Sequence, residues 1–261
     1  MERFEFKKSL GQNFIKDENI VNKIVSSASI DKDTLVIEIG PGAGWLSKKI
    51  IPLSKNTILY EIDTRLRDIL NRELALYDNY ELIFNDALKE DIPSDISKYN
   101  FKKLYVVANI PYYITSPILK KLMFEVYPDK IIIMIQDEVA SRLAAMPGSR
   151  DYGLMTVLFN SRYNIKKLFK VGKNSFVPIP KVDSAVVEMV KENKYEIKDD
   201  DVFDKLISDA FQYKRKTIKN NLKGYDLNKL SLILDKYGYS LSDRAESIPI
   251  NVFIEMANVL S

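Results

Sequence analysis

The segment VVANIPYYITSP could do chemistry, because an apolar run gives way there to an amide, a proline and two tyrosines. An amine attached to an aromatic ring is a poor nucleophile, since its lone pair is delocalised into the ring. The side-chain oxygen of Asn109 and the carbonyl of Ile110 could accept the two amine hydrogens and free the lone pair to attack a methyl group. Pro111 would restrict this turn, and Tyr112 would give the base a ring to stack on. The alternative is a strand-ending turn whose tyrosines are half-buried.

A glycine-rich connection, VIEIGPGAGWLSKKI, comes earlier in the chain. A strand would run into Gly40, Gly42 and Gly44, and a helix would open at Trp45, so that a ligand could approach backbone without side chains in its way. The third glycine follows the second by two residues, whereas the dinucleotide pattern GxGxxG requires three. This spacing argues against a pyrophosphate at the helix N-terminus. A tight turn that binds no ligand is the alternative.

Two acidic residues end the next two predicted strands, Glu61 in YEID and Asp86 in FNDAL. Ligands of an open parallel sheet bind outside the carboxyl ends of its strands, so both carboxylates would face the cleft beside the glycines. Glu61 would hold ribose hydroxyls and Asp86 the exocyclic amine of an adenine, although either could instead cap a helix or a turn. S-adenosylmethionine is a nucleoside cofactor that has an adenosine and no pyrophosphate, and we expect it here.

The composition excludes several kinds of chemistry. The 261 residues include no cysteine and no histidine, which rules out disulfides, a thiolate nucleophile, an imidazole base and a zinc site with those ligands. We therefore expect no metal. No apolar stretch approaches the roughly 20 residues of a membrane span, and the N-terminus lacks the apolar region of a secretory signal. We expect a cytoplasmic protein with no membrane partner.

Apolar, β-branched runs alternate with helical patterns up to residue 155. This alternation predicts an α/β fold with a doubly wound, mainly parallel sheet. Residues 169–190 indicate strand, proline-rich turn and strand, so an antiparallel pair should close one sheet edge. Three helical patterns then predict a small C-terminal all-helical domain, which places the two domains at residues 1–192 and 193–261. The predicted strands cover 34–40, 57–63, 80–86, 102–110 and 130–136, and the predicted helices cover 45–53, 64–76, 116–126, 138–146, 202–213, 227–237 and 252–260.

A one-signed cluster of charges lies in QYKRKTIKNNLK, which contains Lys214, Arg215 and Lys216 and no acidic residue. The net charge of +3 is too small to identify a nucleic-acid partner by itself. A charge run usually solvates one face of a helix, but a cluster of one sign could also grip RNA phosphates. A second basic run, residues 166–173, could contribute. Such contacts would position an RNA and would not read its sequence.

Eight segments in order resemble the ribosomal RNA adenine dimethyltransferases of the kasugamycin-sensitivity type. The segments span nearly the whole chain, and eight ordered segments are far more specific than one motif. They are KKSLGQNFIKDENI, VIEIGPGAGWLS, YEID, FNDAL, VVANIPYYITSPIL, QDEVASRLAAMPGSRDYGLMTV, SFVPIPKVDSAVV and AFQYKRKTIKNNL. The resemblance implies a class I S-adenosylmethionine-dependent methyltransferase domain with a Rossmann-like sheet.

The resemblance also implies a reaction and a substrate. The enzyme would dimethylate N6 of two adjacent adenosines in the 3′-terminal hairpin loop of small-subunit (16S) rRNA, within a 30S assembly intermediate, and we expect it to act as a monomer. The N-terminal segment FKKSLGQNFIKD, residues 6–17, could fold over the cofactor as a lid. Cofactor contacts would fall on Asn13, Ile15, Gly40, Gly42, Glu61, Asp86 and Asn109. Phe176 would sandwich the target base opposite Tyr112, or it could be a hydrophobic plug before a proline turn.

Three other functions stay possible at the level of sequence. An erythromycin-resistance methyltransferase of large-subunit rRNA shares QNF and NIPY, although FVPIPKVDSAVV and FQYKRKT favour the small-subunit family. A non-catalytic RNA-binding relative would be expected to lose cofactor residues, and here every one is present. An NAD-dependent oxidoreductase with Glu61 on the ribose is disfavoured by the glycine spacing and by the absence of histidine and cysteine.

Overall fold

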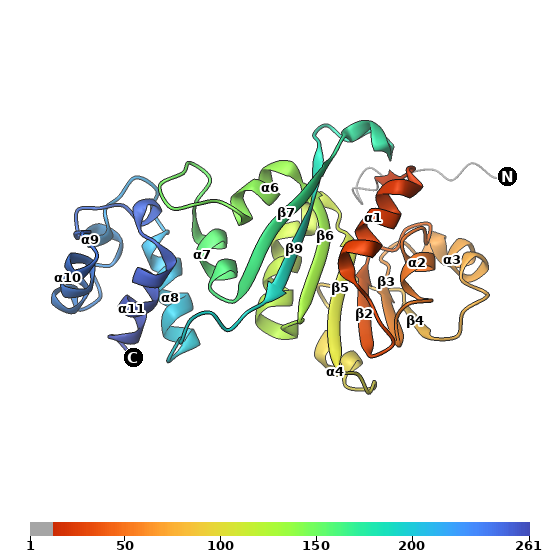
Figure 1. The fold of residues 1–261 in the computed structure, drawn as a ribbon, viewed down its shortest axis with the longest axis horizontal. Coiled ribbons are helices and arrows are strands. Elements are labelled where there is room, and N and C mark those ends of the chain that lie inside the picture. The colour runs from red at the N-terminus through yellow and green to blue at the C-terminus, as the bar shows by residue number, and fades with distance from the viewer. Residues whose placement is uncertain (1–12) are drawn as a thin grey trace. The chain divides into compact units, whose positions relative to one another are not determined.

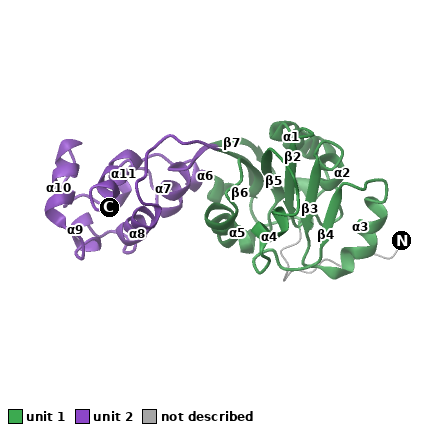
Figure 2. Cartoon of the chain, turned by 90° about the horizontal axis from the view of Figure 1, so that it is seen from below, with its two compact units in different colours: residues 1–140, 166–190 green, residues 141–165, 191–261 purple. Residues whose placement is uncertain are grey.

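The computed structural model describes residues 13–261, so the part of the predicted lid before residue 13 lies outside the described residues. The chain forms two compact units, one of residues 1–140 and 166–190 and the other of residues 141–165 and 191–261 (Figure 2). The first unit contains the sheet and the second contains helices. The units differ from the predicted domains in residues 141–165 and 191–192, which belong with the C-terminal helices.

The sheet of the first unit has seven strands in the order β4-β3-β2-β5-β6-β9-β7 (Figure 1). The five strands from β4 to β6 are parallel to their neighbours, and β9 runs antiparallel to β6. The predicted doubly wound, mainly parallel sheet is therefore confirmed. The strands are β2 (Thr34–Ile39), β3 (Asn56–Tyr60), β4 (Tyr80–Ile83), β5 (Lys103–Asn109), β6 (Lys130–Gln136), β7 (Tyr163–Val171) and β9 (Ser184–Lys191).

A separate two-stranded sheet pairs β1 (Phe14–Ile15) with β8 (Phe176–Val177). The strands are antiparallel, with Ile15 opposite Phe176 and Phe14 opposite Val177. The backbone N–H of Lys16 extends the pairing by donating to the Ser175 carbonyl at 3.0 Å. This small sheet joins the start of the described chain to the segment between β7 and β9.

Helices cover both faces of the large sheet, with α1 on one face and α4 and α5 on the other (Figure 2). Asp17 caps α1 by accepting from the Asn19 N–H, and the apolar face of α1 packs on the centre of the sheet. The helical elements of this region are α1 (Glu18–Ala28), α2 (Ser47–Ile50), η2 (Thr64–Leu66), α3 (Arg67–Glu73), α4 (Ile92–Ile96), η3 (Tyr112–Ile114), α5 (Thr115–Lys121), η4 (Leu122–Val126), α6 (Asp137–Leu143) and η5 (Lys173–Ser175).

The helix predicted over 45–53 is confined to α2. Turns occupy residues 42–46, where Gly42 and Gly44 have φ angles of +59° and +77°, which lie outside the helical region. At the other end, Pro52 has no backbone N–H and cannot continue the helical hydrogen bonds. The helical pattern in the sequence is therefore longer than the helix in the structure.

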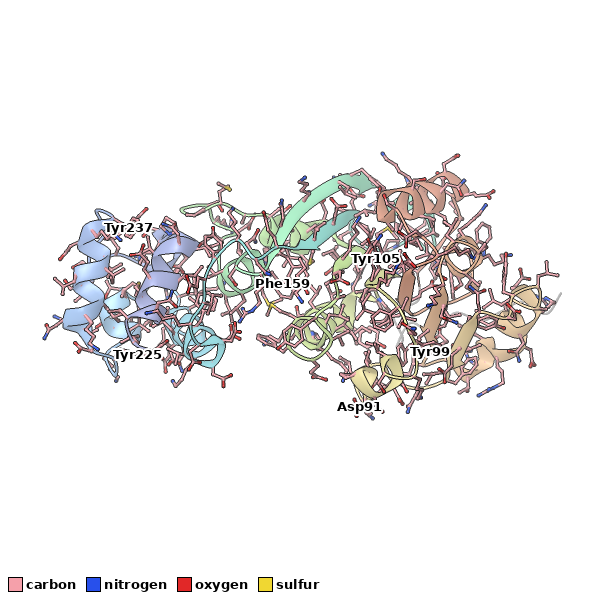
Figure 3. All side chains as sticks on the ribbon, turned by 60° about the horizontal axis from the view of Figure 1, so that its bottom comes forward. Asp91, Tyr99, Tyr105, Phe159, Tyr225 and Tyr237 are labelled. Atoms are coloured by element: carbon pink, nitrogen blue, oxygen red, sulfur yellow. The ribbon has the colours of Figure 1, made fainter. Side chains whose placement is uncertain are left out.

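The second unit contains α7 (Leu154–Asn160), α8 (Asp200–Ala210), α9 (Ile218–Asn221), α10 (Leu227–Lys236), η6 (Ala245–Ser247) and α11 (Ile250–Asn258). The rings of Phe211 and Phe253 pack at 5.7 Å between centroids. Tyr225 and Tyr237, labelled in Figure 3, donate to the carboxylates of Asp209 and Glu255. These bonds join the loop before α10 to α8 and the end of α10 to α11.

Residues 141–165 belong to the second unit because their polar side chains bind its helices. Arg162 contacts the carboxylates of Asp200 and Asp204 at 2.6 and 2.9 Å. The Tyr152 hydroxyl is buried and donates to the Ile248 carbonyl at 2.9 Å. None of these contacts is visible as a local pattern, so the sequence assigned the segment to the sheet domain.

Within residues 13–261, no helix combines the length and the apolar character needed to cross a membrane.

The fold predicts a large cost for truncating the centre of the sheet. Every side chain of β2 is buried, and Ile37 has no exposed surface. Ile37→Ala should lower the free energy of unfolding by about 2–5 kcal/mol, because it removes buried methyl groups and leaves a cavity. Leu232→Ala on α10, whose residue is 72% exposed, should change it by less than about 0.5 kcal/mol. Urea unfolding followed by circular dichroism measures both, and equal effects would contradict this account of the core.

Candidate active site

A cavity lies at the carboxyl ends of β2, β3, β4 and β5. Its lining includes Asn13, Gly40, Glu61, Asp86 and Asn109, which come from five separate parts of the chain. The strand order reverses between β2 and β5, and such a switch point is where open α/β sheets bind ligands. The structure therefore brings the sequence-predicted cofactor residues together. Ile15, Gly42, Ile110, Pro111 and Tyr112 also line the cavity.

The glycine-rich loop after β2 needs glycine at the positions that the sequence indicated. Gly40 and Gly42 have φ angles of +73° and +59°, in the left-handed region that side chains disfavour. A Cβ on Gly42 would also overlap the ring of Phe14, which packs directly on the loop. Gly44 does not line the cavity and instead packs against Leu70 of α3.

Glu61 is the buried carboxylate of the site. One oxygen accepts from the Gly42 N–H at 3.0 Å and the other from the Asp63 N–H at 2.9 Å. Burial raises the pKa of this carboxyl above its ordinary value, while the two backbone N–H groups oppose the shift. Each carboxylate oxygen can accept more than one hydrogen bond, so Glu61 keeps acceptor capacity towards the cavity.

Glu38 is a second buried carboxyl in the cavity lining, and sequence reasoning missed it. It is 1% exposed and accepts from the Ser47 hydroxyl at 2.6 Å. Burial raises the pKa of Glu38 to about 8, and the nearby Glu61 adds to the shift. The sequence does contain a signal for Glu38, which is a glutamate inside the hydrophobic strand VIEIG. A charged residue is rarely buried without a partner, so such a position indicates a special role.

The outer part of the cavity combines Asp86 with apolar and aromatic walls. The Asp86 Oδ1 accepts from the Leu88 N–H at 3.0 Å, and no residue among 13–261 donates to its Oδ2. Trp45, Ile62 and Tyr113 also line the cavity and are 45–52% exposed. A planar base fits such walls, and a carboxylate oxygen suits its exocyclic amine. This donor set therefore fits an adenosine, with Glu61 as acceptor for ribose hydroxyls.

Hydrogen bonds to neighbouring segments hold the turn after β5. The Asn109 Nδ2 donates to the Asn13 carbonyl at 3.1 Å, and the Ile110 N–H donates to the Met134 carbonyl at 3.2 Å. In residues 13–261, no group donates to the Asn109 Oδ1 or to the Ile110 carbonyl. The turn therefore presents two acceptors whose hydrogen-bonding capacity is unused.

Tyr112 follows in the same turn and also lines the cavity. Its hydroxyl lies 2.6 Å from the Ser184 Oγ at the start of β9. Burial raises the pKa of the phenol above its ordinary value, so the ring is neutral at physiological pH. The fixed, neutral ring suits stacking on a base.

Phe176 does not line the cavity. It is 1% exposed and belongs to the hydrophobic core with Ile15 and Val171. Pairing of β8 with β1 sets Phe176 directly opposite Ile15, and the buried ring occupies the core behind that pair. The structure therefore places Phe176 in the core beside Ile15, outside the lining of the cavity, and its role opposite Tyr112 stays a prediction.

The basic cluster of the second unit lies on a turn between α8 and α9, not on a helix. Lys214, Arg215 and Lys216 are exposed, and none of them pairs with an acidic side chain of residues 13–261. The Asn221 side chain donates to the Ala210 and Tyr213 carbonyls and so holds the turn. An antiparallel bridge between Thr217 and Arg244 brings an exposed arginine next to this turn. The sequence could not reveal this neighbour, because the two residues are far apart in the chain.

The second basic run is partly neutralised. Lys167 contacts Asp137 at 2.7 Å, and Lys170 contacts Asp183 at 2.9 Å. These pairs leave fewer charges for RNA than the turn that contains Lys214.

The strand order and the cleft define a class I S-adenosylmethionine-dependent methyltransferase. A dimethyladenosine transferase from Plasmodium falciparum has the same fold with a TM-score of 0.77 and 26% identity, over 93% of this chain and 95% of that one. The 23S rRNA methyltransferase ErmE shares the fold with a TM-score of 0.74 at 23% identity, over 95% of this chain and 99% of that one.

The sequence profile described as ribosomal RNA adenine dimethylase matches residues 3–261. A ribosomal RNA small subunit methyltransferase A from Clostridium acetobutylicum is 40% identical over 98% of this chain and 94% of its own length. One from Bacillus mycoides is 39% identical over 98% of this chain and 92% of its own length. The chain belongs to the ribosomal RNA adenine dimethylase family, which confirms the resemblance seen in the sequence, and its cofactor is S-adenosylmethionine.

The buried Glu38 predicts a pH-dependent stability. A glutamate in the unfolded chain titrates near 4.5, whereas Glu38 in the fold keeps its proton up to about pH 8. The folded state therefore binds the extra proton in this window, and the free energy of unfolding should fall as pH rises through it. Glu38→Gln cannot titrate, so its stability should fall less than that of the wild type between about pH 5 and about pH 8.

Urea midpoints at both pH values measure this difference. Glu125→Gln, which changes a glutamate with a 52% exposed side chain, is the matched control and should follow the wild-type slope. Parallel slopes for Glu38→Gln and the wild type would show that Glu38 is ionised in the fold at neutral pH.

Proposed function

We propose that this protein dimethylates N6 of two adjacent adenosines in the 3′-terminal hairpin loop of 16S rRNA, during assembly of the small ribosomal subunit. The observation that carries the proposal is the pair of unused acceptors, the Asn109 Oδ1 and the Ile110 carbonyl, on a turn that borders the cofactor cavity. Family membership gives the class of reaction. The small-subunit substrate is supported by the names of the relatives that are 39–40% identical.

The residues of the cavity divide between the two ends of the cofactor. Glu61 and Asp86 would hold the ribose and the adenine, and the backbone of Gly40 and Gly42 would face the rest of the molecule together with Asn13 and Ile15. S-adenosylmethionine, when bound, supplies an electrophilic methyl group on a sulfonium. No metal is needed for this chemistry.

Asn109 and Ile110 act on the target amine. The two oxygens accept its two hydrogens, which pulls the nitrogen towards tetrahedral geometry and frees the lone pair for attack. Positive charge builds on the nitrogen during transfer, and the two carbonyl dipoles stabilise it. The amine loses a proton to solvent after transfer, so no general base has to act first. Tyr112 offers the surface on which the base stacks.

The RNA is held by phosphate contacts to the basic turn, residues 214–216, with Arg244 beside it. The loop adenosine is single-stranded or is cheaply unstacked, so it can enter a pocket. We propose that the enzyme works as a monomer on an assembly intermediate in the cytoplasm, where such intermediates are made. Primer extension on rRNA from a deletion strain tests the substrate, because it distinguishes small-subunit from large-subunit sites.

Asn109→Ala should reduce the rate of methyl transfer by about 10²–10³-fold, because it removes one of the two acceptors that stabilise the charge on the nitrogen. RNA affinity should stay within about twofold, since the basic turn is untouched. The measurement is incorporation of labelled methyl into unmethylated 30S subunits at saturating cofactor.

Asn100→Ala is the matched control, because Asn100 is exposed in the loop before β5, at the opposite end of the same strand. It should retain the wild-type rate. Near-normal turnover in Asn109→Ala would remove the role assigned to the amide, and inactivity of the wild type on 30S subunits would contradict the proposed substrate.

Replacing Lys214, Arg215 and Lys216 with alanine should weaken RNA binding and reduce the slope of log affinity against log salt by about 2–3, at roughly 0.7–0.9 per phosphate contact. The control replaces Lys98, Lys102 and Lys103, which removes the same charge from ion-paired residues. Filter binding over a salt series measures both slopes. Equal slopes in the two triple variants would show that total charge matters and that this turn does not.

A further inference from the structure

The ring of Tyr112 is tethered at its far end to a single buried hydroxyl. The Tyr112 hydroxyl and the Ser184 Oγ are 2.6 Å apart, and either can be the donor. In residues 13–261, this is the sole hydrogen bond of the Ser184 side chain. The hydroxyl of a serine commonly forms a hydrogen bond with nearby backbone. The hydrogen bond between Ser184 and the hydroxyl of a cavity-lining tyrosine therefore needs a separate explanation.

Ser184 is itself held in place from several sides. It is 0% exposed and pairs with Gln136 of β6 as the first residue of β9. The preceding Asp183 accepts from the Asp137 N–H through its carbonyl and from the Lys173 N–H through its carboxylate, both at 3.0 Å. The Ser184 hydroxyl is therefore held in place on the sheet. Its hydrogen bond to the Tyr112 hydroxyl holds the far end of the ring in place as well.

The other end of the turn is fixed in a similar way. The Asn109 Nδ2 bonds to the Asn13 carbonyl and the Ile110 N–H bonds to the Met134 carbonyl. Tyr112 lies two residues farther along the turn and also lines the cavity, and its side chain can swing about the Cα–Cβ bond unless something holds it. The bond to Ser184 prevents this swing, because it fixes the hydroxyl at the far end of the ring.

We propose that Ser184 is a positioning residue for methyl transfer, which holds the Tyr112 ring in one place so that the target base stacks beside the Asn109 and Ile110 acceptors. The inference rests on the proposed function, because the ring serves as a platform only if an adenine enters the cavity. Misplacement of a reacting group by a small distance lowers the rate steeply, so a tether far from the reacting atoms can matter.

The test is a double-mutant cycle of Ser184→Ala, Tyr112→Phe and the double variant. Each single change deletes one partner of the same hydrogen bond and keeps the ring. Each should lower the single-turnover rate on unmethylated 30S subunits by about three- to tenfold, and the double variant should be no slower than the slower single variant. The dissociation constant for S-adenosylmethionine should change by less than about twofold, since none of the proposed cofactor contacts is altered.

Ser54→Ala is the matched control. Ser54 is also 0% exposed, and its hydroxyl bonds to Thr57 and to the Ile51 carbonyl before β3, outside the cavity lining. It should lower the thermal midpoint about as much as Ser184→Ala and leave the rate of transfer unchanged. This comparison separates lost stability from lost positioning.

Three outcomes would overturn the proposal: a wild-type rate for Ser184→Ala, losses that multiply in the double variant, or an equal loss of rate in Ser54→Ala. If Ser184→Ala does not fold, Tyr112→Phe removes the same bond from its half-buried end, and a wild-type rate for that variant overturns the proposal too. A wild-type enzyme that fails to methylate 30S subunits would instead contradict the proposed function.

Discussion

Parallel strands that are linked by helices all end at the same edge of their sheet, and the site depends on this constraint. Right-handed crossovers return each strand to the same direction, so the residues that follow β2, β3, β4 and β5 meet although they are far apart in the sequence. The switch between β2 and β5 then opens a space between the glycine-rich loop and the turn at Asn109. The hydrogen bond from Gly42 to Glu61 joins two of these loops directly.

The electrostatics of the site follow from burial. Glu38 and Glu61 lie in the same cavity wall, and loss of water raises the pKa of both carboxyls. The groups assigned to the target amine are uncharged carbonyl oxygens, whose strength does not depend on a proton. In the proposed function, a chain without histidine or cysteine promotes nitrogen methylation through such fixed dipoles.

The sequence was informative about the sheet because its signals are local. The β-branched runs predict the parallel strands closely, and the glycine spacing identifies the loop in which two cavity-lining glycines have positive φ angles. Helix lengths were less predictable, since α2 covers only four of the nine residues in its predicted range. Residues 141–165 were assigned to the sheet domain because the bonds of Arg162 and Tyr152 to distant helices leave no local pattern.

The sequence by itself determined the polar and glycine residues that follow the strands and line the cavity, from Gly40 to the Asn109 turn, because their type and their place after each strand follow from the order of the chain. Tertiary structure decided where two aromatic rings lie: Phe176 is buried opposite Ile15, and Tyr112 is tethered to Ser184. It also decided that burial raises the pKa of Glu38 to about 8 and that Arg244 joins the basic turn. Burial and pairing between residues far apart are properties of the packed fold, and no short stretch of sequence encodes them.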